Sequence, residues 1–373
     1  MSDDVARAWA YLSRVAEPPC PALNALVARV GVVEAADRVR TGQAGAAVND
    51  GVESRRHIDC AARDLDLLAA MGGRLVTPDD DEWPMLAFTA FAGIGGRLRP
   101  QAHKPMVLWV VGSARLDDVT ARAAAVVGTR AATAYGEFAA GDLAAGLAGR
   151  DVAVVSGAAF GIDGAAHRAA LAADGLTVAV LAGGIDVPYP AGHSALLRRI
   201  AEDGTLITEY PPGVRPARHR FLTRNRLVAA LAGATVVVEA GARSGAANTA
   251  AWAGALGRAV CAVPGPITSS ASVGCHVLLR DGARLITRAE EVIELVGRIG
   301  ELAPDEPRPV SPLDGLDDTD KRVYDALPAR AARDLDEIAM AAGLPARQVL
   351  GPLATLELAG LVRRRDGRWK RVL

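Results

Sequence analysis

The chain contains a series of short apolar segments that alternate with helix-like segments across its middle, and this alternation limits the fold more than any other feature. The apolar segments carry apolar residues at consecutive positions rather than at every second one. Consecutive apolar residues are typical of parallel strands that are covered on both faces. Strands that alternate with helices predict an α/β fold built on a doubly wound parallel sheet. The segments are MVLWVVG, AAVVG, VAVVSG, TVAVLAGG, TLITEY, TVVVEA and AVCAVPG, between residues 106 and 265.

The chain has 373 residues, which is enough for two or three domains. Residues 1–75 contain amphipathic helical segments and no strand pattern, so we expect a small helical domain there. Residues 76–298 hold the α/β domain. Residues 299–316 are rich in proline and acidic residues and are expected to form a linker.

The last segment, residues 317–373, predicts three helices followed by a hairpin. Asp334 is placed to cap the second helix, and Gly343 is placed to end it. The pair Asp366-Gly367 lies between two short basic strands and is typical of a type I′ turn. Three helices and a basic hairpin together predict a winged helix.

The formal net charge is -1 at pH 7, so the chain as a whole has no electrostatic preference for nucleic acid or for a membrane. Only three lysines occur, and arginine, whose planar guanidinium group suits phosphate, supplies most of the positive charge. The first residues are acidic, and no apolar run approaches the roughly 20 residues of a membrane span. The four cysteines form no close pairs. These features predict a cytoplasmic protein with reduced thiols and no membrane association.

Several of the apolar segments are followed by glycine, hydroxyl or arginine residues. In a doubly wound sheet the carboxyl ends of the strands form the ligand-binding edge, where glycine lets an anion approach the backbone and helix N-termini attract it. We therefore expect these loops to form a shared site for more than one phosphate, although glycine also ends strands in ordinary tight turns. The loop residues are Gly128, Thr129, Arg130, Ser156, Gly157, Arg243, Ser244 and Gly245.

The motifs of common nucleotide-binding enzymes are missing. No lysine stands where a P-loop requires it, no GxGxxG opens a helix, and the histidines have no metal-ligand spacing. Asp163 and His167 could form an acid–base pair on a helix, but we favour Asp163 as a helix cap with His167 packed above it. Glu209 and Glu239 are the acids at strand ends, and we expect a structural role for Glu239. We expect no catalysis, no cofactor and no bound metal.

The segment RHRFLTRNR, residues 218–226, gathers four arginines and a histidine around one phenylalanine in a chain that is 4% aromatic. The bases of a single strand expose faces that stack on an aromatic ring, and arginines follow the phosphates. A duplex hides those faces, so this composition favours single-stranded nucleic acid. We expect Thr223 to cap a helix that starts at Arg224 and holds Arg226 in its first turn. The alternative is a solvated basic loop with Phe221 in the core.

A set of motifs resembles the DNA-processing protein A family, also called DprA or Smf. The motifs are VVGTR, VSGAAFGID, LAGGIDVPYP, ITEYPPG, RFLTRNRLVAAL, VVVEAGARSGAANTA and VPGPI, and they occur in this order over about half of the chain. The resemblance implies an extended Rossmann-like domain between a helical domain similar to the sterile-alpha-motif fold and a winged-helix domain. It also implies a cytoplasmic, homodimeric, non-catalytic protein that binds and protects single-stranded DNA. Such a protein loads the RecA recombinase during natural transformation, and a single-strand-binding protein is a further candidate partner.

The resemblance also implies which residues contact DNA. Arg218 stands where the family usually has lysine, Leu222 stands where it usually has proline, and Gly274-Cys275-His276 departs from a usual glycine–asparagine segment. The contacts carried over to this chain are Gly128, Thr129, Arg130, Arg218, Phe221, Arg224, Asn225, Arg226, Arg243, Ser244 and Gly245. The glycine-loop argument above adds Ser156 and Gly157.

Two other functions remain open from the residues alone. The same type of sheet occurs in nucleotide-processing enzymes, although the Pro-Gly-Gly-x-Gly-Thr loop of nucleotide phosphoribohydrolases is missing. The winged helix could instead regulate transcription by reading duplex DNA with its third helix in the major groove. We expect the hairpin to be an accessory DNA contact through Arg363, Arg364, Arg365, Arg368 and Lys370.

Overall fold

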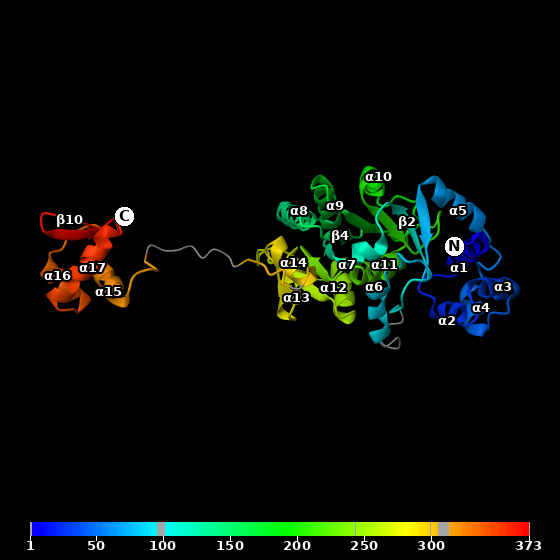
Figure 1. Cartoon of the computed structure of the whole chain (residues 1–373), viewed down its shortest axis with the longest axis horizontal. Coiled ribbons are helices and arrows are strands. Elements are labelled where there is room, and N and C mark those ends of the chain that lie inside the picture. The colour runs from blue at the N-terminus through cyan, green and yellow to red at the C-terminus, as the bar shows by residue number, and fades with distance from the viewer. Residues whose placement is uncertain (1, 95–100, 243, 299, 305–312, 373) are drawn as a thin grey trace. The chain divides into compact units, whose positions relative to one another are not determined.

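The structure is a computed structural model that describes residues 2–94, 101–242, 244–298, 300–304 and 313–372. The chain forms two compact units, Met1–Ala303 and Pro304–Leu373, and each is described here by itself (Figure 1). The boundaries at residues 75, 298 and 316 that we drew from composition stay predictions.

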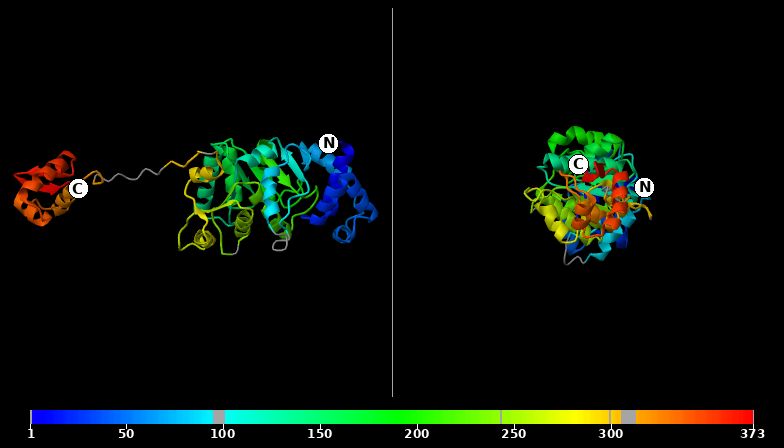
Figure 2. Two further views of the ribbon diagram at one scale, coloured as in Figure 1. Left: turned by 60° about the horizontal axis from the view of Figure 1, so that its bottom comes forward. Right: turned by 90° about the vertical axis from the view of Figure 1, so that its left-hand side faces the viewer.

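The N-terminal part of the larger unit is helical, as expected. Its helices are α1 (Asp3–Val15), α2 (Pro21–Val30), α3 (Val32–Thr41), α4 (Ala46–Val52) and α5 (Ala61–Ala70). A short strand that the sequence did not predict, β1 (Gly73–Val76), follows them and pairs with β2 (Leu108–Gly112). Trp9 and Tyr11 of α1 share one buried cluster with Trp109 of β2, so these helices cover one face of the sheet near its β1 edge (Figures 1 and 2).

The larger unit is built on a nine-stranded sheet with the order β1-β2-β6-β5-β4-β3-β7-β8-β9. The strands from β3 to β9 pair with one another in parallel, which confirms the doubly wound α/β fold. They are β3 (Ala123–Val127), β4 (Ala153–Ser156), β5 (Thr177–Val180), β6 (Thr205–Thr208), β7 (Ala234–Val237), β8 (Ala259–Ala262) and β9 (Arg284–Leu285).

One expected parallel strand is antiparallel. The segment MVLWVVG forms β2, which pairs antiparallel with both β1 and β6. It is apolar at every position because both of its faces are covered: Trp109 and Val111 pack toward the N-terminal helices, and Leu108 and Val110 belong to the cluster on the other face. Burial on both faces therefore explains the sequence pattern, and strand direction does not.

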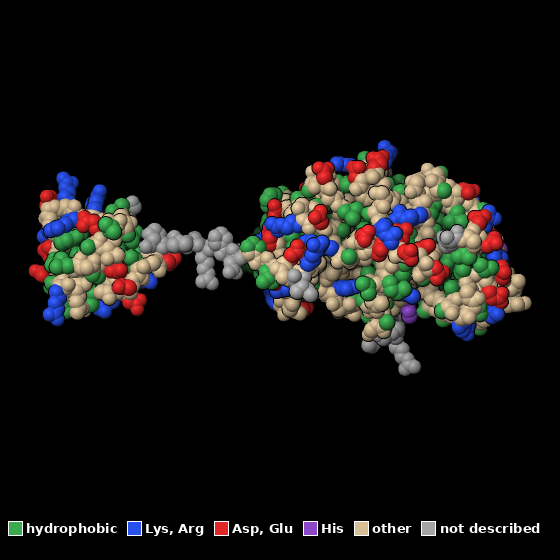
Figure 3. Space-filling view, viewed as in Figure 1, with side chains coloured by type: hydrophobic (Ala, Val, Ile, Leu, Met, Phe, Trp, Pro, Cys, Tyr) green, Lys and Arg blue, Asp and Glu red, His purple; other side chains and the backbone are tan. Residues whose placement is uncertain are grey.

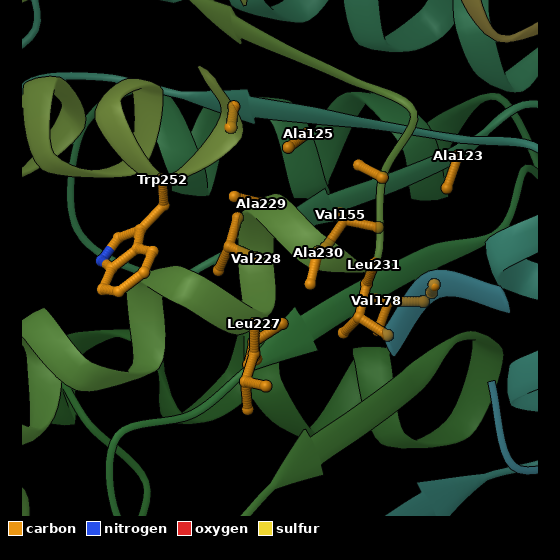
Figure 4. Close-up of a cluster of buried hydrophobic side chains, with 14 of the residues drawn as sticks. Ala123, Ala125, Val155, Val178, Leu227, Val228, Ala229, Ala230, Leu231 and Trp252 are labelled. Carbon is orange, nitrogen blue, oxygen red and sulfur yellow. The ribbon is translucent and has the colours of Figure 1, made fainter. Parts of the chain in front are cut away.

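Helices cover both faces of the sheet. On one face, α8 (Ala134–Ala148), α9 (Ile162–Ala172) and α14 (Ala289–Val296) pack on Val126, Val154 and their neighbours, and α10 (Ser194–Asp203) packs nearer to the β2 end. On the other face, Leu227 and Val228 of α11 (Arg218–Ala230) and Trp252 of α12 (Gly245–Ala255) pack with strand residues such as Val155 (Figure 4). The remaining helical segments are α6 (Met85–Thr89), η1 (Ala90–Gly93), α7 (Leu116–Ala121), η2 (Ala191–His193) and α13 (Val273–Arg280).

The order of the strands reverses beside β3. From β3 the chain builds the sheet outward through β4, β5 and β6, and it then returns through α11 to place β7 on the other side of β3. Such a reversal leaves a crevice beyond the carboxyl ends of the two adjacent strands, which is the usual ligand position in open α/β sheets. The fold therefore predicts a ligand-binding site at the loops after β3 and β7.

The smaller unit contains α15 (Asp318–Ala326), α16 (Leu335–Ala342), α17 (Ala346–Leu358), β10 (Val362–Arg365) and β11 (Arg368–Arg371). Asp334 caps α16 in a capping box with Glu337, and Gly343 ends the helix in the left-handed conformation with φ 65°, both as predicted. Asp366 and Gly367 have φ values of 54° and 78°, the positive values that a type I′ turn requires.

Candidate nucleic-acid interface

The basic segment lies on helix α11, which begins at Arg218 rather than at Arg224. The predicted cap at Thr223 is wrong, because the last extended residue before the helix is Ala217, with φ -141° and ψ 156°. Thr223 is buried inside the helix. The earlier start places Arg218 and Phe221 in the first turn and moves Arg224 to the second.

A pocket of about 840 Å³ opens at the carboxyl ends of β3, β4 and β7, beside the point where the strand order reverses. It brings together most of the residues that the sequence assigned to the site. Those that line it are Gly128, Thr129, Arg130, Gly157, Arg218, Phe221, Arg224, Asn225, Ser244 and Gly245. Residue 243 lies outside the described residues, so the predicted contact of Arg243 stays a prediction.

Helix α11 lines the pocket with one stripe of side chains. Arg218, Phe221, Leu222, Asn225 and Val228 all face it, and their spacing of three and four residues puts them on one face of a helix. Arg218 is exposed at the start of this stripe, and Val228 is buried at its end. The stripe therefore runs from a charged outer end to an apolar inner end.

The ring of Phe221 is half-buried and contacts both a cation and a second ring. Its centroid is 5.3 Å from that of Tyr189, and the guanidinium carbon of Arg130 lies 5.2 Å from the centroid of Phe221. The ring is thus held in place without being sealed in the core, which excludes the alternative that its role is only to fill the interior. Tyr189 was missed in the sequence, although it stands in the LAGGIDVPYP segment directly after β5.

Two arginines at the pocket are free to meet an anion. Arg130 and Arg218 are exposed, and within the described part of the chain neither has an ion-pair partner. The hydroxyl of Ser244 accepts a hydrogen bond from the backbone N–H of Ala247 at 3.2 Å and so caps α12. Space around Gly245 is open, since a Cβ built there would have no neighbour within 4 Å. A helix N-terminus and two unpaired guanidinium groups therefore face the same pocket.

The floor of the pocket holds a buried arginine. Arg224 donates from Nη1 to the carbonyl of Val180 at 2.8 Å, and its burial lowers its pKa to about 10, partly opposed by the charge of Asp163. The carboxylate of Asp163 accepts hydrogen bonds from the backbone N–H groups of Gly157 at 3.1 Å and Ala159 at 3.3 Å. A side chain at position 157 would collide with the Arg224 guanidinium. Arg224 therefore packs directly against the loop at Gly157. The loss of hydration on burial explains the lower pKa of Arg224.

Two predicted contacts are turned away from the pocket. Arg226 is completely buried and donates to both carboxylate oxygens of Glu209, at 2.6 and 2.7 Å. Ser156 is buried and donates to the carbonyl of Val126 at 2.7 Å. Neither side chain is accessible, so neither Arg226 nor Ser156 is part of the proposed DNA-binding surface. Asn225 stays at the pocket, and its amide donates to the carbonyl of Gly245 at 3.3 Å.

The residues considered above as catalytic candidates make hydrogen bonds to other residues of the protein. His167 is bonded through Nδ1 to the hydroxyl of Thr177 at 2.7 Å, and burial lowers its pKa to about 3, so it forms no pair with Asp163. Asp163 lies inside α9, after the N-cap Gly161, and holds the loop rather than the helix end. Glu239 accepts from the N–H and hydroxyl of Thr133, at 2.9 and 2.6 Å, which confirms its structural role. In the described ranges, no His, Cys, Asp and Glu side chains form a metal-binding group.

The hairpin of the smaller unit presents a second group of cations. Arg363, Arg364, Arg365 and Arg368 are exposed, and Lys370 is half-buried. The Arg364 guanidinium lies over the buried Trp369 ring, 4.7 Å from its centroid. Trp369 therefore supports the hairpin from inside and is not free to stack on a ligand.

On the face of the larger unit that Figure 3 shows, basic and acidic side chains are interspersed. Among the helices that the structure describes, none is both long and apolar enough to cross a membrane. The fold and the site together define a doubly wound α/β protein with a cationic, aromatic pocket at its sheet reversal and a separate basic winged helix.

Comparison with known families gives the particular family. The model for DNA recombination-mediator protein A matches residues 74–297, and the model for the DprA winged helix domain matches residues 306–368. The chain belongs to the DNA-processing protein A family. The resemblance and the winged helix read from the sequence are thereby confirmed.

Curated relatives extend over most of the chain. A DNA processing protein DprA of Mycobacterium tuberculosis H37Rv, described as putative, is 70% identical over 370 residues, which cover 99% of this chain and 95% of that protein. The protein Smf of Escherichia coli K12 is 38% identical over 243 residues, 64% of each chain. The DNA processing protein DprA of Streptococcus pneumoniae R6 is 40% identical over 189 residues, 51% of this chain and 66% of its own.

Two solved structures of the family resemble this one. The crystal structure of DNA processing protein A from Streptococcus pneumoniae has a TM-score of 0.60 at 30% identity, and it covers 78% of this chain and 95% of its own. The structure of DNA processing protein A from Helicobacter pylori, described for its single-stranded DNA binding mode, has a TM-score of 0.51 at 27% identity and covers 60% and 94%.

Proposed function

We propose that this protein binds single-stranded DNA across the pocket at the sheet reversal. The observation that carries the proposal is the half-exposed ring of Phe221, which contacts both Tyr189 and Arg130. In this proposal an unpaired base stacks on that ring, and the exposed guanidinium groups of Arg130 and Arg218, which line the same pocket, bind neighbouring phosphates. The H. pylori relative, described for its single-stranded DNA binding mode, supports this assignment.

The wider role is part of the same proposal. We infer that the bound strand is protected from nucleases and passed to a RecA recombinase, in keeping with the family description as a recombination mediator. A cytoplasmic location, a homodimer, contact with a single-strand-binding protein and a setting in natural transformation are the remaining parts. The proposal contains no catalytic step, since Glu209 and Glu239 are both held by internal partners.

The test of DNA binding uses Phe221→Ala and oligo-dT in fluorescence anisotropy at several salt concentrations. We expect the affinity to fall by about 1–3 kcal/mol, the contribution of one base–aromatic stack, with little change in the salt slope. The matched control is Phe138→Ala, because Phe138 is an exposed phenylalanine on α8 that does not line the pocket. Equal, tight binding by the wild type and Phe221→Ala would contradict the proposal.

Each of the other two functions has its own readout. Release of free base from nucleoside monophosphates by the pure protein would favour the enzyme. For the winged helix we propose an accessory DNA contact, because the arginines of the hairpin are exposed and therefore accessible to phosphates. Replacement of Arg363, Arg364 and Arg365 by alanine should weaken DNA binding and lower its salt dependence. Loss of duplex binding alone would favour a duplex-reading regulator instead.

A further inference from the structure

A second phenylalanine lies open beside the pocket. Phe160 follows β4 in the loop between Gly157 and Gly161, and the residue is 47% exposed. Two of the five phenylalanines, Phe88 and Phe91, are buried in the core. Phe160 therefore presents a large apolar ring to solvent from a loop whose neighbouring residue, Ala159, lines the pocket.

The ring of Phe160 is supported from behind. It meets the His193 ring edge to face, with centroids 4.7 Å apart, and His193 is itself buried and bonded through Nδ1 to the carbonyl of Ala158 at 3.1 Å. Gly192 lies directly against it, since a Cβ built there would be 3.1 Å from the ring. These contacts hold the ring in place, while about half of the residue stays exposed to solvent.

The backbone holds the loop in an unusual conformation. Ala158 is buried with φ 57°, a left-handed value that is uncommon for a residue with a side chain. Gly161 has φ 73° and packs so closely on the carbonyl of Thr129 that no side chain would fit. Such strained positions persist where the surrounding structure determines them and cluster at binding sites. The loop is therefore tied to the Thr129–Arg130 side of the pocket.

One short segment joins the two open rings. Tyr189 packs on Phe221, and Gly192, three residues further on, packs on Phe160. Three residues span at most about 11 Å between Cα atoms. Phe221 and Phe160 thus contact opposite ends of the same four-residue segment, residues 189–192.

We infer that Phe160 is a second base-stacking position for the same DNA strand. The inference rests on the proposed function and adds to it a path: from the Phe221 ring, past Tyr189, to the Phe160 ring. Stacking on a phenylalanine accepts every base, since each has a π-face. The second position therefore lengthens the bound segment without selecting a sequence.

The test measures affinity for an oligo-dT series of increasing length, for wild type, Phe160→Ala, Phe160→Leu and Phe160→Trp. For wild type, affinity should rise in a step once the strand is long enough to reach Phe160. The alanine and leucine variants should lose that step, at least about fivefold in affinity, and the tryptophan variant should keep it. Leucine retains apolar packing against His193, so its loss of the step separates stacking from a folding defect, which thermal melting checks independently.

The two proposals can fail separately. If Phe221→Ala weakens binding at every length while Phe160→Ala matches wild type at every length, the second stacking position is wrong and the DNA-binding function stands. If neither wild type nor variants bind oligo-dT, the function itself is wrong. Photocrosslinking from a 5-bromodeoxyuridine strand gives a direct readout: a crosslink to the peptide that contains Phe160 supports the inference, and crosslinks confined to Phe221 and Tyr189 overturn it.

Discussion

The first and last arginines of the basic segment lie on one helix and have opposite surroundings. Arg218 is exposed at the mouth of the pocket, whereas Arg226 is completely buried with both of its carboxylate contacts on Glu209. They are two turns apart on α11; Arg218 lines the pocket, and Arg226 does not line it and contacts Glu209. The comparison teaches that a cluster of like charges in a sequence can hold both a binding surface and a piece of the core.

The difference follows from where the helix begins. A start at Arg218 places Arg218, Phe221 and Asn225 on the pocket face and leaves Arg226 on another. A guanidinium group tolerates that burial because its fork matches a carboxylate with two parallel hydrogen bonds. The same residue type thus serves solvent-facing recognition at one end and an internal ion pair at the other.

The largest expected effect is the loss of stability when the buried pair is broken. Arg226→Met removes the cation and leaves the carboxylate of Glu209 buried without its partner. We expect the free energy of unfolding of the larger unit to fall by about 3–5 kcal/mol. Chemical denaturation followed by tryptophan fluorescence measures it.

The same substitution at the exposed end is the matched control. Arg218→Met should change the free energy of unfolding by no more than about 0.5 kcal/mol, as is usual for surface positions. The double variant Arg226→Met with Glu209→Leu should recover much of the loss, because replacing both partners by apolar groups is often neutral. If Arg226→Met lowers the free energy of unfolding no more than Arg218→Met does, the buried ion pair does not stabilise the fold as proposed.

A smaller effect, on DNA affinity, should appear at the exposed arginines. Arg218→Ala and Arg130→Ala each remove one phosphate contact, which we expect to weaken binding at low salt by about 1–2 kcal/mol. Each should also reduce the slope of log affinity against log salt by about 0.7, the value for one phosphate of a single strand. Anisotropy titrations between low and moderate salt measure both quantities.

Arg130→Ala should have the larger affinity loss of the two, because Arg130 also lies over the Phe221 ring. The folded stability of both variants should match that of wild type. Unchanged salt slopes in both variants would mean that the phosphates are met elsewhere, and the pocket face of α11 would then have no special role.

The sequence was sufficient for the core of the fold and for the loops that carry the site. Valine-rich segments covered on both faces predicted the strands, and the rule that ligands bind at carboxyl ends of parallel strands predicted the loop of Gly128 and that of Ser244. Strand β1 was missed because four residues with half-buried first positions give no pattern. Strand direction at β2 was wrong because two-sided burial does not depend on it.

The sequence of residues 218–226 did not show which of its arginines would be exposed and which would be buried. Thr223 looked like a cap, but a cap needs an extended backbone, and Ala217 supplies it instead. The partner of Arg226 is Glu209, which is close to it only after the sheet and helix have packed. A residue list from motifs therefore identifies the element that binds and does not separate its outer side chains from its inner ones.

The smallest effect concerns Arg220, whose surroundings are intermediate between those of Arg218 and Arg226. Its guanidinium donates from Nε and Nη2 to the two carboxylate oxygens of Glu17, at 2.7 and 2.9 Å, and Arg55 donates to the same carboxylate at 2.9 Å. Glu17 follows α1, so this pair ties the N-terminal helices to the first turn of α11. Because the pair is partly exposed, Glu17→Gln should cost about 1 kcal/mol or less of unfolding free energy at neutral pH.

The dependence of that cost on pH gives the pair a signature of its own. Burial raises the pKa of Glu17, but the hydrogen bonds and charges of Arg220 and Arg55 together outweigh it, so the pKa lies below its ordinary value. A lowered pKa means that the folded state holds the carboxylate more strongly than the unfolded chain does. The stabilisation is therefore present above the unfolded pKa of about 4.3 and is lost as the pH falls through the folded one. Thermal melting of wild type and Glu17→Gln from pH 7 downward should give two curves of melting temperature against pH that converge below about pH 4.

Because Arg220 does not line the pocket, DNA affinity should stay unchanged in Glu17→Gln. A loss as large as that of Phe221→Ala would place the N-terminal helices among the elements that position the stacking ring.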